Sequence, residues 1–193
     1  MRIFLAGSTG VIGRHLVPLF VAAGHDVAGM TRSPAAAAGL RDAGAVPVVC
    51  DVFDAAALTA AVATFAPDVV MHQLTDLPDD AAALAGGAAA NARIRIEGTR
   101  NLVAAAQAAG ASRFLAQSIA WTPTSDVAAR AKLDLERQVL EIGGVVLRYG
   151  QFYGPGTYFP DELPPEPRVE VGRAASLTVT HLTDPSGIVT VVD

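Results

Sequence analysis

Cysteine is almost absent from this chain of 193 residues, because Cys50 is the only one. A single cysteine excludes a disulfide within the chain and is typical of proteins in a reducing compartment, so we expect a cytoplasmic protein. Cys50 ends an apolar run of residues. This position indicates a small buried side chain rather than a nucleophile.

Charge is also scarce: 17% of the residues are charged, the formal net charge is −5, and Lys132 is the only lysine among 14 basic residues. An acidic balance without basic runs argues against nucleic acid or an anionic membrane as a partner. No apolar stretch is long enough to span a bilayer, and strand-forming residues follow Met1 and Arg2 directly, so we expect no signal peptide. No His, Cys and Asp side chains have metal-ligand spacing, so we expect no metal.

Hydrophobic residues, in contrast, make up 51% of the chain and occur in short runs that alternate with helical segments. Such runs are typical of strands that are covered on both faces. The predicted strands are Ile3–Ala6, Val27–Met30, Val46–Cys50, Val69–His72, Arg113–Gln117, Val145–Tyr149 and Ile188–Val192. The predicted helices are Val11–Ala23, Pro34–Ala43, Ala55–Phe65, Ala88–Ala109, Asp126–Glu141 and Arg173–Leu182. Ser33 and Asp54 are expected to cap the second and third helices.

This alternation predicts an α/β fold, namely a Rossmann-type doubly wound three-layer sandwich with a mainly parallel sheet of about seven strands. The length suits one core, so we expect a single domain over residues 1–193. The pattern weakens at the proline-rich segment Gly150–Pro167, which we expect to be a long loop before a short strand at Arg168–Val171. Residues from about 150 to 185 are therefore expected to form a reduced substrate region.

A glycine-rich turn joins the first predicted strand to the first predicted helix. It consists of Gly7, Ser8, Thr9, Gly10, Val11, Ile12 and Gly13. Glycines at this spacing allow a tight turn, let the backbone approach a pyrophosphate and aim free N–H groups at it. A glycine triplet alone is a weak signal, but its position between a strand and a helix predicts a dinucleotide-binding site.

The end of the second predicted strand indicates which dinucleotide binds. A site selective for NAD needs a carboxylate there to accept a hydrogen bond from the ribose 2′-hydroxyl. This chain has Thr31, Arg32 and Ser33 instead, and a guanidinium suits a 2′-phosphate. We therefore expect NADP(H) to be preferred and NAD(H) to be the alternative, unless Arg32 only faces solvent. Asp51 and Val52, after the third strand, are expected to meet the adenine.

Several longer segments carry a family resemblance: GSTGVIGRHLVPLFVAAGHDV, CDVFDAAALTAAV, PDVVMHQLT, NARIRIEGTRNLVAAAQAAGASRFLAQS, VVLRYGQFYGPGT and GIVTVVD. Through them the chain resembles the extended short-chain dehydrogenase/reductase family, the NAD-dependent epimerase/dehydratase group, over nearly its whole length. The resemblance implies that Gln73, Leu74 and Thr75 flank the cofactor's ribose and that Asn91 lies near the active site. It also implies that the turn after Tyr149 borders nicotinamide and substrate.

Catalysis in this family uses a Ser or Thr that holds the substrate oxygen, a Tyr that transfers its proton, and a Lys four residues later that binds the ribose and lowers the pKa of the tyrosine. The resemblance places Ser118 near the serine position, which itself aligns with Ile119. It places Lys132 at the lysine position, with Glu136 one turn further on. Ala128 stands at the tyrosine position, and an alanine cannot donate a proton. The cofactor half of the site is therefore present, and the catalytic half is changed.

Candidates for a substitute acid are residues near the carboxyl ends of the strands, because open α/β sheets bind ligands there. Tyr149 lies there, and Tyr153 and His72 lie there too. Each of the last two has an alternative role, Tyr153 as a packing residue and His72 as a buried histidine with satisfied hydrogen bonds. The catalytic candidates are therefore Ser118, Lys132 and Tyr153.

The sequence predicts an NADP(H)-binding oxidoreductase or epimerase-like enzyme that acts on a small metabolite with an atypical catalytic set. Two alternatives stay open. One is a redox sensor that binds NADP(H) without turnover, and the other is a pocket used for a non-redox reaction such as cyclisation or dehydration. The resemblance further implies a homodimer, because relatives pair through long helices that correspond to residues 88–109 and 126–141 here.

Overall fold

A computed structural model describes every residue of the chain except 79, 81–83 and 85. Seven strands form one parallel sheet in the order β3-β2-β1-β4-β5-β6-β9, and two further strands form a small second sheet. The strands of the large sheet are β1 (Arg2–Ala6), β2 (Asp26–Thr31), β3 (Val46–Val49), β4 (Val69–His72), β5 (Arg113–Ile119), β6 (Val145–Tyr149) and β9 (Gly187–Val191). The predicted doubly wound α/β fold is therefore confirmed.

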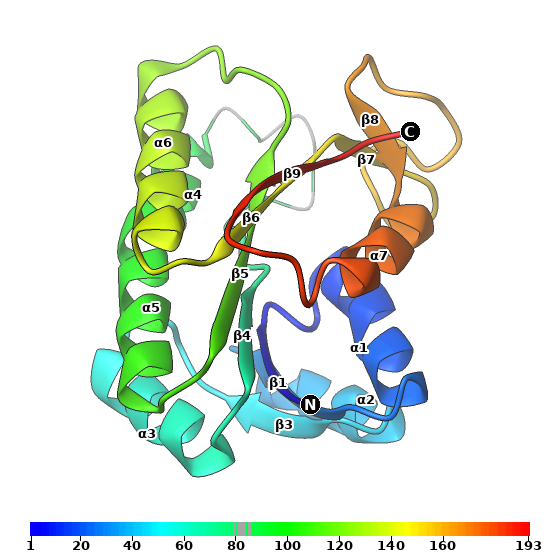
Figure 1. The fold of residues 1–193 in the computed structure, drawn as a ribbon. Helices are drawn as coiled ribbons and strands as arrows, with labels where there is room; N and C mark the ends of the chain where they lie inside the picture. The colour runs from blue at the N-terminus through cyan, green and yellow to red at the C-terminus, as the bar shows by residue number, and fades with distance from the viewer. Residues whose placement is uncertain (79, 81–83, 85) are drawn as a thin grey trace.

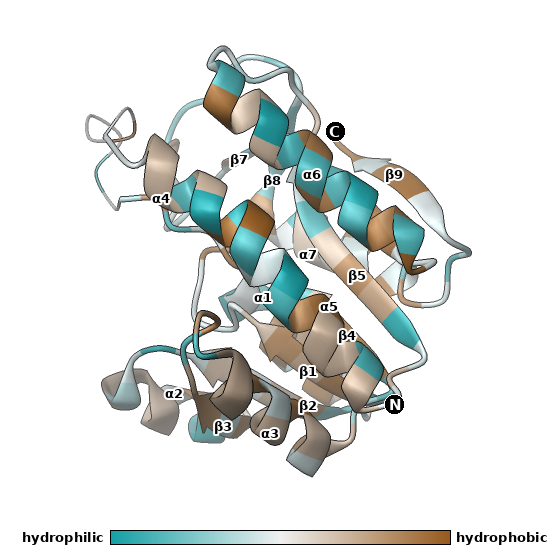
Figure 2. Cartoon of the chain, turned by 90° about the vertical axis from the view of Figure 1, so that its left-hand side faces the viewer, coloured by the Kyte–Doolittle hydropathy of each residue, from teal (hydrophilic) through white to brown (hydrophobic). Residues whose placement is uncertain are grey.

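Helices cover both faces of the large sheet (Figure 1). One face is covered by α1 (Gly13–Ala22), α2 (Ala37–Asp42) and α7 (Val171–Thr180). The other face is covered by α3 (Ala55–Phe65), α5 (Thr99–Ala108) and α6 (Asp126–Glu141). Figure 2 views this second layer face on, with α6 lying in front of β5.

Strand periodicity explains why both layers are held by apolar packing. Successive side chains of a strand point to opposite faces of the sheet. In β1, Ile3 and Leu5 therefore join the core beneath α1, whereas Phe4 and Ala6 join the core beneath α3 and α5. Cys50 belongs to the second core and is buried, as predicted. Within the described residues, no helix is both long and apolar enough to cross a membrane.

The structure corrects several predicted elements. The segment predicted as helix Pro34–Ala43 is a short 3₁₀ turn, η1 (Pro34–Ala36), followed by α2, and the Ser33 side chain makes no capping hydrogen bond. The cap predicted at Asp54 is confirmed, because its carboxylate accepts a hydrogen bond from the Ala57 N–H (3.0 Å). The last helix begins at Val171 rather than Arg173, because Glu170 caps it by accepting from two backbone N–H groups.

Residues 150–167 are not wholly loop. β7 (Gln151–Tyr153) pairs in parallel with β8 (Arg168–Glu170) and forms the small second sheet. The long helix predicted over residues 88–109 also differs from expectation in its middle. It consists of α4 (Ala88–Arg93), a π-helical turn η3 (Ile94–Gly98) and α5. Turns of this kind occur often at functional sites.

A buried ionic cluster joins α6 to the carboxyl ends of β5 and β6. The Glu136 cluster, as we name it, consists of Ser118, Lys132, Glu136 and Arg148. Glu136 Oε1 accepts hydrogen bonds from Ser118 Oγ (2.6 Å), Lys132 Nζ (2.8 Å) and Arg148 Nε (2.9 Å), and Oε2 accepts from Arg148 Nη2 (2.6 Å). Ser118 and Arg148 are direct neighbours in the register of β5 and β6, so both side chains point toward α6.

Glu136 stays ionised in this environment. Burial alone would raise its pKa, but hydrogen bonds from Arg148, Lys132 and Ser118 outweigh burial and lower the pKa to about 2. A carboxylate with a lowered pKa contributes stability above its unfolded-state value, here 4.5, and loses that contribution as the pH falls toward the folded value.

The Glu136→Gln variant tests this cluster. We expect it to lose on the order of 3–5 kcal/mol of unfolding free energy at pH 7, because Lys132 and Arg148 are left without their carboxylate. The wild type should lose most of this advantage between about pH 4.5 and about pH 2, since its contribution depends on the ionised form. Urea unfolding at several pH values measures both effects.

Glu141→Gln is the matched control, because Glu141 lies on the same helix and pairs with Arg137 at an exposed position. Exposed pairs contribute little to stability, so its unfolding curve should stay close to that of the wild type. Equal losses in the two variants would show that the Glu136 cluster does not hold α6 to the sheet.

Candidate functional site

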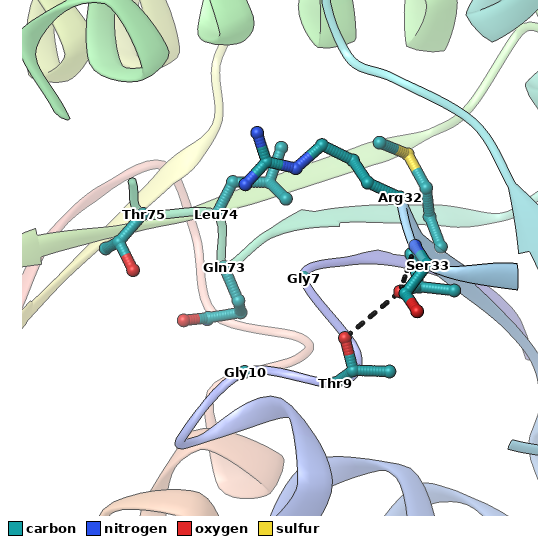
Figure 3. Close-up of a pocket in the computed structure, with 10 residues that line it drawn as sticks. Gly7, Thr9, Gly10, Arg32, Ser33, Gln73, Leu74 and Thr75 are labelled. Carbon is teal, nitrogen blue, oxygen red and sulfur yellow. Dashed lines mark hydrogen bonds between the residues drawn. The ribbon is translucent and has the colours of Figure 1, made fainter. Parts of the chain in front are cut away.

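A pocket of about 420 Å³ lies at the carboxyl ends of β1, β2 and β4. The sheet order reverses between β1 and β4, which is where open α/β sheets bind their ligands. Figure 3 shows the pocket. Its lining consists of Gly7, Thr9, Gly10, Met30, Thr31, Arg32, Ser33, Gln73, Leu74 and Thr75.

Two glycines of the turn after β1 lie too close to other backbone to carry a side chain. Gly7 has a φ of +90°, and a Cβ there would lie 2.6 Å from the carbonyl oxygen of Gln73. A Cβ at Gly13 would lie 2.1 Å from the carbonyl oxygen of Gly7. The turn is therefore packed against the end of β4 and against the start of α1, and this leaves a cradle of bare backbone that faces the pocket.

One buried acceptor beside this cradle has no partner within the described residues. Gln73 donates from Nε2 to the Tyr149 hydroxyl (3.2 Å), and Tyr149 lies within 2.7 Å of Thr178 Oγ1, which in turn donates to the Ala174 carbonyl. This chain of donors directs the amide nitrogen of Gln73 toward Tyr149. The amide oxygen, Oε1, is left buried without a hydrogen bond.

The cradle and the free acceptor fit a dinucleotide. A pyrophosphate suits backbone N–H groups beside the start of α1, and a hydroxyl or amide donor suits Gln73 Oε1. The hydroxyls of Thr9 and Thr31, which both line the pocket, are hydrogen-bonded to each other (3.2 Å; Figure 3). Thr31 Oγ1 also accepts a hydrogen bond from the Ser33 N–H (3.2 Å). These bonds hold the first and second strand ends together.

Arg32 lies at the rim of the pocket with about half of its side chain exposed. Its Nη2 lies 3.2 Å from Asp76 Oδ1, so the guanidinium is paired with a carboxylate of the segment that follows β4. The backbone N–H of Asp76 donates to Asn91 Oδ1 (3.2 Å). Asn91, which the resemblance placed near the active site, therefore fixes the segment that carries the partner of Arg32.

Nine of the predicted cofactor residues line this pocket, and the other seven are not among its lining residues. Sequence reasoning missed Met30, because an apolar residue at the end of a buried strand carries no signal of its own. The predicted residues outside the lining are Ser8, Val11, Ile12, Gly13, Asp51, Val52 and Lys132. Ser8 and Val52 are buried in the structure, and Asp51 Oδ1 accepts from the Phe53 N–H instead of facing the pocket.

The structure brings two of the three catalytic candidates together. Ser118 and Lys132 both donate to the same oxygen of Glu136 and are at most 9% exposed. Tyr153 is not part of this cluster, because it lies on β7 and its hydroxyl donates to Asp193 Oδ2 (2.9 Å). That bond raises the pKa of Tyr153, whereas a catalytic tyrosine needs a lowered pKa.

His72 is held by hydrogen bonds on both ring nitrogens. Nδ1 accepts from the Leu74 N–H (3.1 Å), so Nε2 carries the proton and meets Thr99 Oγ1 (3.1 Å). Burial, helped by the charge of Arg95, lowers the pKa of His72 to about 3. His72 is therefore neutral, and its hydrogen bond to the Leu74 N–H fixes the backbone of Gln73 and Leu74. Among the described residues, no three His, Cys, Asp or Glu side chains form a group that holds a metal ion.

Comparison with known proteins agrees with this architecture. The model of the NAD dependent epimerase/dehydratase family matches residues 3–168. UDP-glucose 4-epimerase from Thermotoga maritima, solved with UDP-glucose, superposes on the whole chain and 77% of its own length, with a TM-score of 0.81 and 15% identity. UDP-glucose 4-epimerase from Thermus thermophilus, solved with NAD, has a TM-score of 0.80 and 20% identity over the whole chain and 78% of its own length. At these identities the likeness is one of fold.

A relative found by sequence has a higher identity to this chain than these solved structures. The 3-diazoavenalumate denitrifying reductase of a Streptomyces species is 40% identical over 191 residues, which cover 81% of this chain and 58% of that protein. The chain thus spans less than two thirds of the length of this relative. With a family model matched over most of its residues and the epimerase fold over its whole length, the chain belongs to the NAD dependent epimerase/dehydratase family.

Proposed function

We propose that the protein is an NADP(H)-dependent reductase whose substrate accepts a hydride without receiving a proton from the protein. The observation that carries this proposal is Ala128. It stands one turn before Lys132 on α6, where the family's catalytic tyrosine belongs, and its side chain has no proton to give. The pocket supports the cofactor part of the proposal through its glycine turn and the free acceptor of Gln73.

The missing acid restricts the substrate. Reduction of a ketone builds negative charge on oxygen, and a general acid typically accelerates such a step by a factor of roughly 10²–10⁴. A substrate that already carries positive charge has no such need. The similar Streptomyces reductase acts, by its name, on a diazo compound with loss of nitrogen. We therefore propose an aryl diazonium group as the hydride acceptor.

The proposed reaction balances without an added proton. The bound cofactor supplies a hydride. The terminal nitrogen of the diazonium accepts it, the neutral aryl diazene that results breaks its carbon–nitrogen bond, and N₂ leaves while the hydrogen moves to carbon. The glycine turn would bind the dinucleotide, Gln73 Oε1 would accept a hydrogen bond from it, and Ala128 would supply no acid to the substrate.

Single-turnover oxidation of NADPH tests this function. We expect 4-diazophenol to oxidise protein-bound NADPH with formation of phenol. Acetophenone should react at least about a hundred-fold more slowly, which is the lower end of the rate acceleration that a general acid supplies. The Gly10→Val variant is the control for uncatalysed reaction, because its side chain fills the cradle. A protein that binds NADPH but oxidises it with neither compound is a sensor, and that result would contradict the proposal.

The preference for NADP(H) is proposed from Arg32. Removing the guanidinium should cost roughly ten- to hundred-fold in NADPH affinity and nothing in NADH affinity, since only NADPH offers a 2′-phosphate. Calorimetric titration of wild type and Arg32→Ala with both cofactors measures this difference. Asp76→Asn is the matched variant. It removes the carboxylate that competes for Arg32, so NADPH should bind it more tightly than it binds the wild type. Equal affinity of the wild type for both cofactors would show that the preference is wrong.

We also propose a homodimer that forms through the outer face of α6. Val127 and Leu133 lie on this helix and are 54% and 63% exposed. Light scattering at micromolar concentration should give twice the mass of one chain, and Leu133→Glu should give the mass of one chain, because a buried unpaired charge opposes association. A wild type with the mass of one chain would contradict this assembly.

A further inference from the structure

Arg95 is a buried cation, and one of its nitrogens lacks a hydrogen-bond acceptor within the described part of the chain. It lies in the π-helical turn η3 and is 7% exposed. Its Nη1 is buried and has no hydrogen-bond partner. A buried guanidinium nitrogen that lacks a partner loses hydration without compensation, so it is costly for a fold to retain.

The neighbours of Arg95 do not neutralise it. Glu136 is close enough to favour its charge, yet both oxygens of Glu136 are already bound by Ser118, Lys132 and Arg148. Burial dominates and lowers the pKa of Arg95. His72 lies near enough for the charge of Arg95 to lower its pKa, and it is neutral. Lys132 and Arg148 bind the Glu136 carboxylate and Arg95 lies near it, so the four side chains together carry an excess of positive charge.

The backbone holds Arg95 in this position. Thr99 Oγ1 donates to the Arg95 carbonyl (2.6 Å) and meets His72 at the end of β4. The carboxyl ends of β5 and β6 adjoin through Ser118 and Arg148, and the Arg148 side chain is 31% exposed, so the group opens to solvent there. The positive excess therefore lies at the same edge of the sheet as the dinucleotide pocket, beyond the end of β4.

We propose that Arg95 anchors a subsite for a carboxylate group of the substrate. A planar carboxylate matches the fork of a guanidinium and supplies the acceptor that Nη1 lacks. The subsite rests on the proposed function, since it assigns the anionic end of the substrate whose other end accepts the hydride. Acids should therefore bind more tightly than neutral analogues of the same shape.

Benzoate and benzamide test the subsite, because they share a shape and differ in charge. On protein saturated with NADPH, calorimetry should show benzoate binding at least about ten-fold more tightly than benzamide, the factor that one charge-assisted hydrogen bond typically supplies. Arg95→Met should remove the difference. Arg93→Met is the matched control, because Arg93 lies two residues away, is exposed and pairs with Glu97, so the preference for benzoate should persist.

Thermal unfolding separates this role from a structural one. If Arg95 binds an anionic ligand and does not stabilise the fold, Arg95→Met should melt at the same temperature as the wild type or higher. Benzoate should then raise the melting temperature of the wild type but not that of Arg95→Met. A marked fall in the melting temperature of Arg95→Met would instead make Arg95 a counterion of the fold. Arg95→Lys, which keeps the charge, should fold and should still lose most of the benzoate affinity.

The outcome is independent of catalysis. NADPH should bind Arg95→Met as tightly as it binds the wild type, so failure of the cofactor site would be seen as lost NADPH binding in both proteins. Equal affinity of the wild type for benzoate and benzamide would overturn the subsite and would leave the proposed hydride transfer unaffected.

Discussion

The close approach of the Gly7 turn to the end of β4 is the constraint on which the site depends. A side chain at Gly7 would collide with the Gln73 carbonyl, and one at Gly13 would collide with Gly7 itself. Because this approach is so close, bare backbone faces the pocket and Gln73 is brought beside it. β1 and β4 are paired strands and the sheet order reverses between them, so the glycine turn places the binding site at this reversal.

The second half of the site is organised by charge rather than by a catalytic tyrosine. Glu136 gathers Ser118, Lys132 and Arg148 at the ends of β5 and β6, and it stays ionised because their hydrogen bonds outweigh its burial. Two residues that a family resemblance assigns to chemistry are therefore engaged in holding a carboxylate. This arrangement leaves an unpaired N–H group on Arg95, and a substrate that carries a carboxylate and whose reduction needs no acid matches both features.

Strand and helix identity could be predicted because the signals are local. The apolar runs predicted all strands of the large sheet, and α6 was predicted with its observed bounds, since Ser125 caps it and its apolar residues keep helical spacing. The pocket followed as well, because the glycine spacing requires a particular backbone. These features depend on neighbouring residues in the sequence, and the sequence alone contains that information.

Features set by distant contacts could not be predicted. β8 was predicted as a short strand, but its pairing with β7 across a proline-rich segment was not, because the three residues of β7 carry no strand signal of their own. The π-helical turn and the buried Nη1 of Arg95 arise where η3, α6 and β4 meet. The pairing of Tyr153 with Asp193, at the far end of the chain, is of the same kind.

The most direct test of the central claim is the rate of hydride transfer in a single turnover, measured from pH 6 to pH 9 in H₂O and in D₂O with a diazonium substrate. A reaction that takes no proton from the protein should show a rate that is independent of pH and the same in both solvents. A rate that falls with the ionisation of one group, and that slows in D₂O, would reveal a substitute acid and would contradict the account.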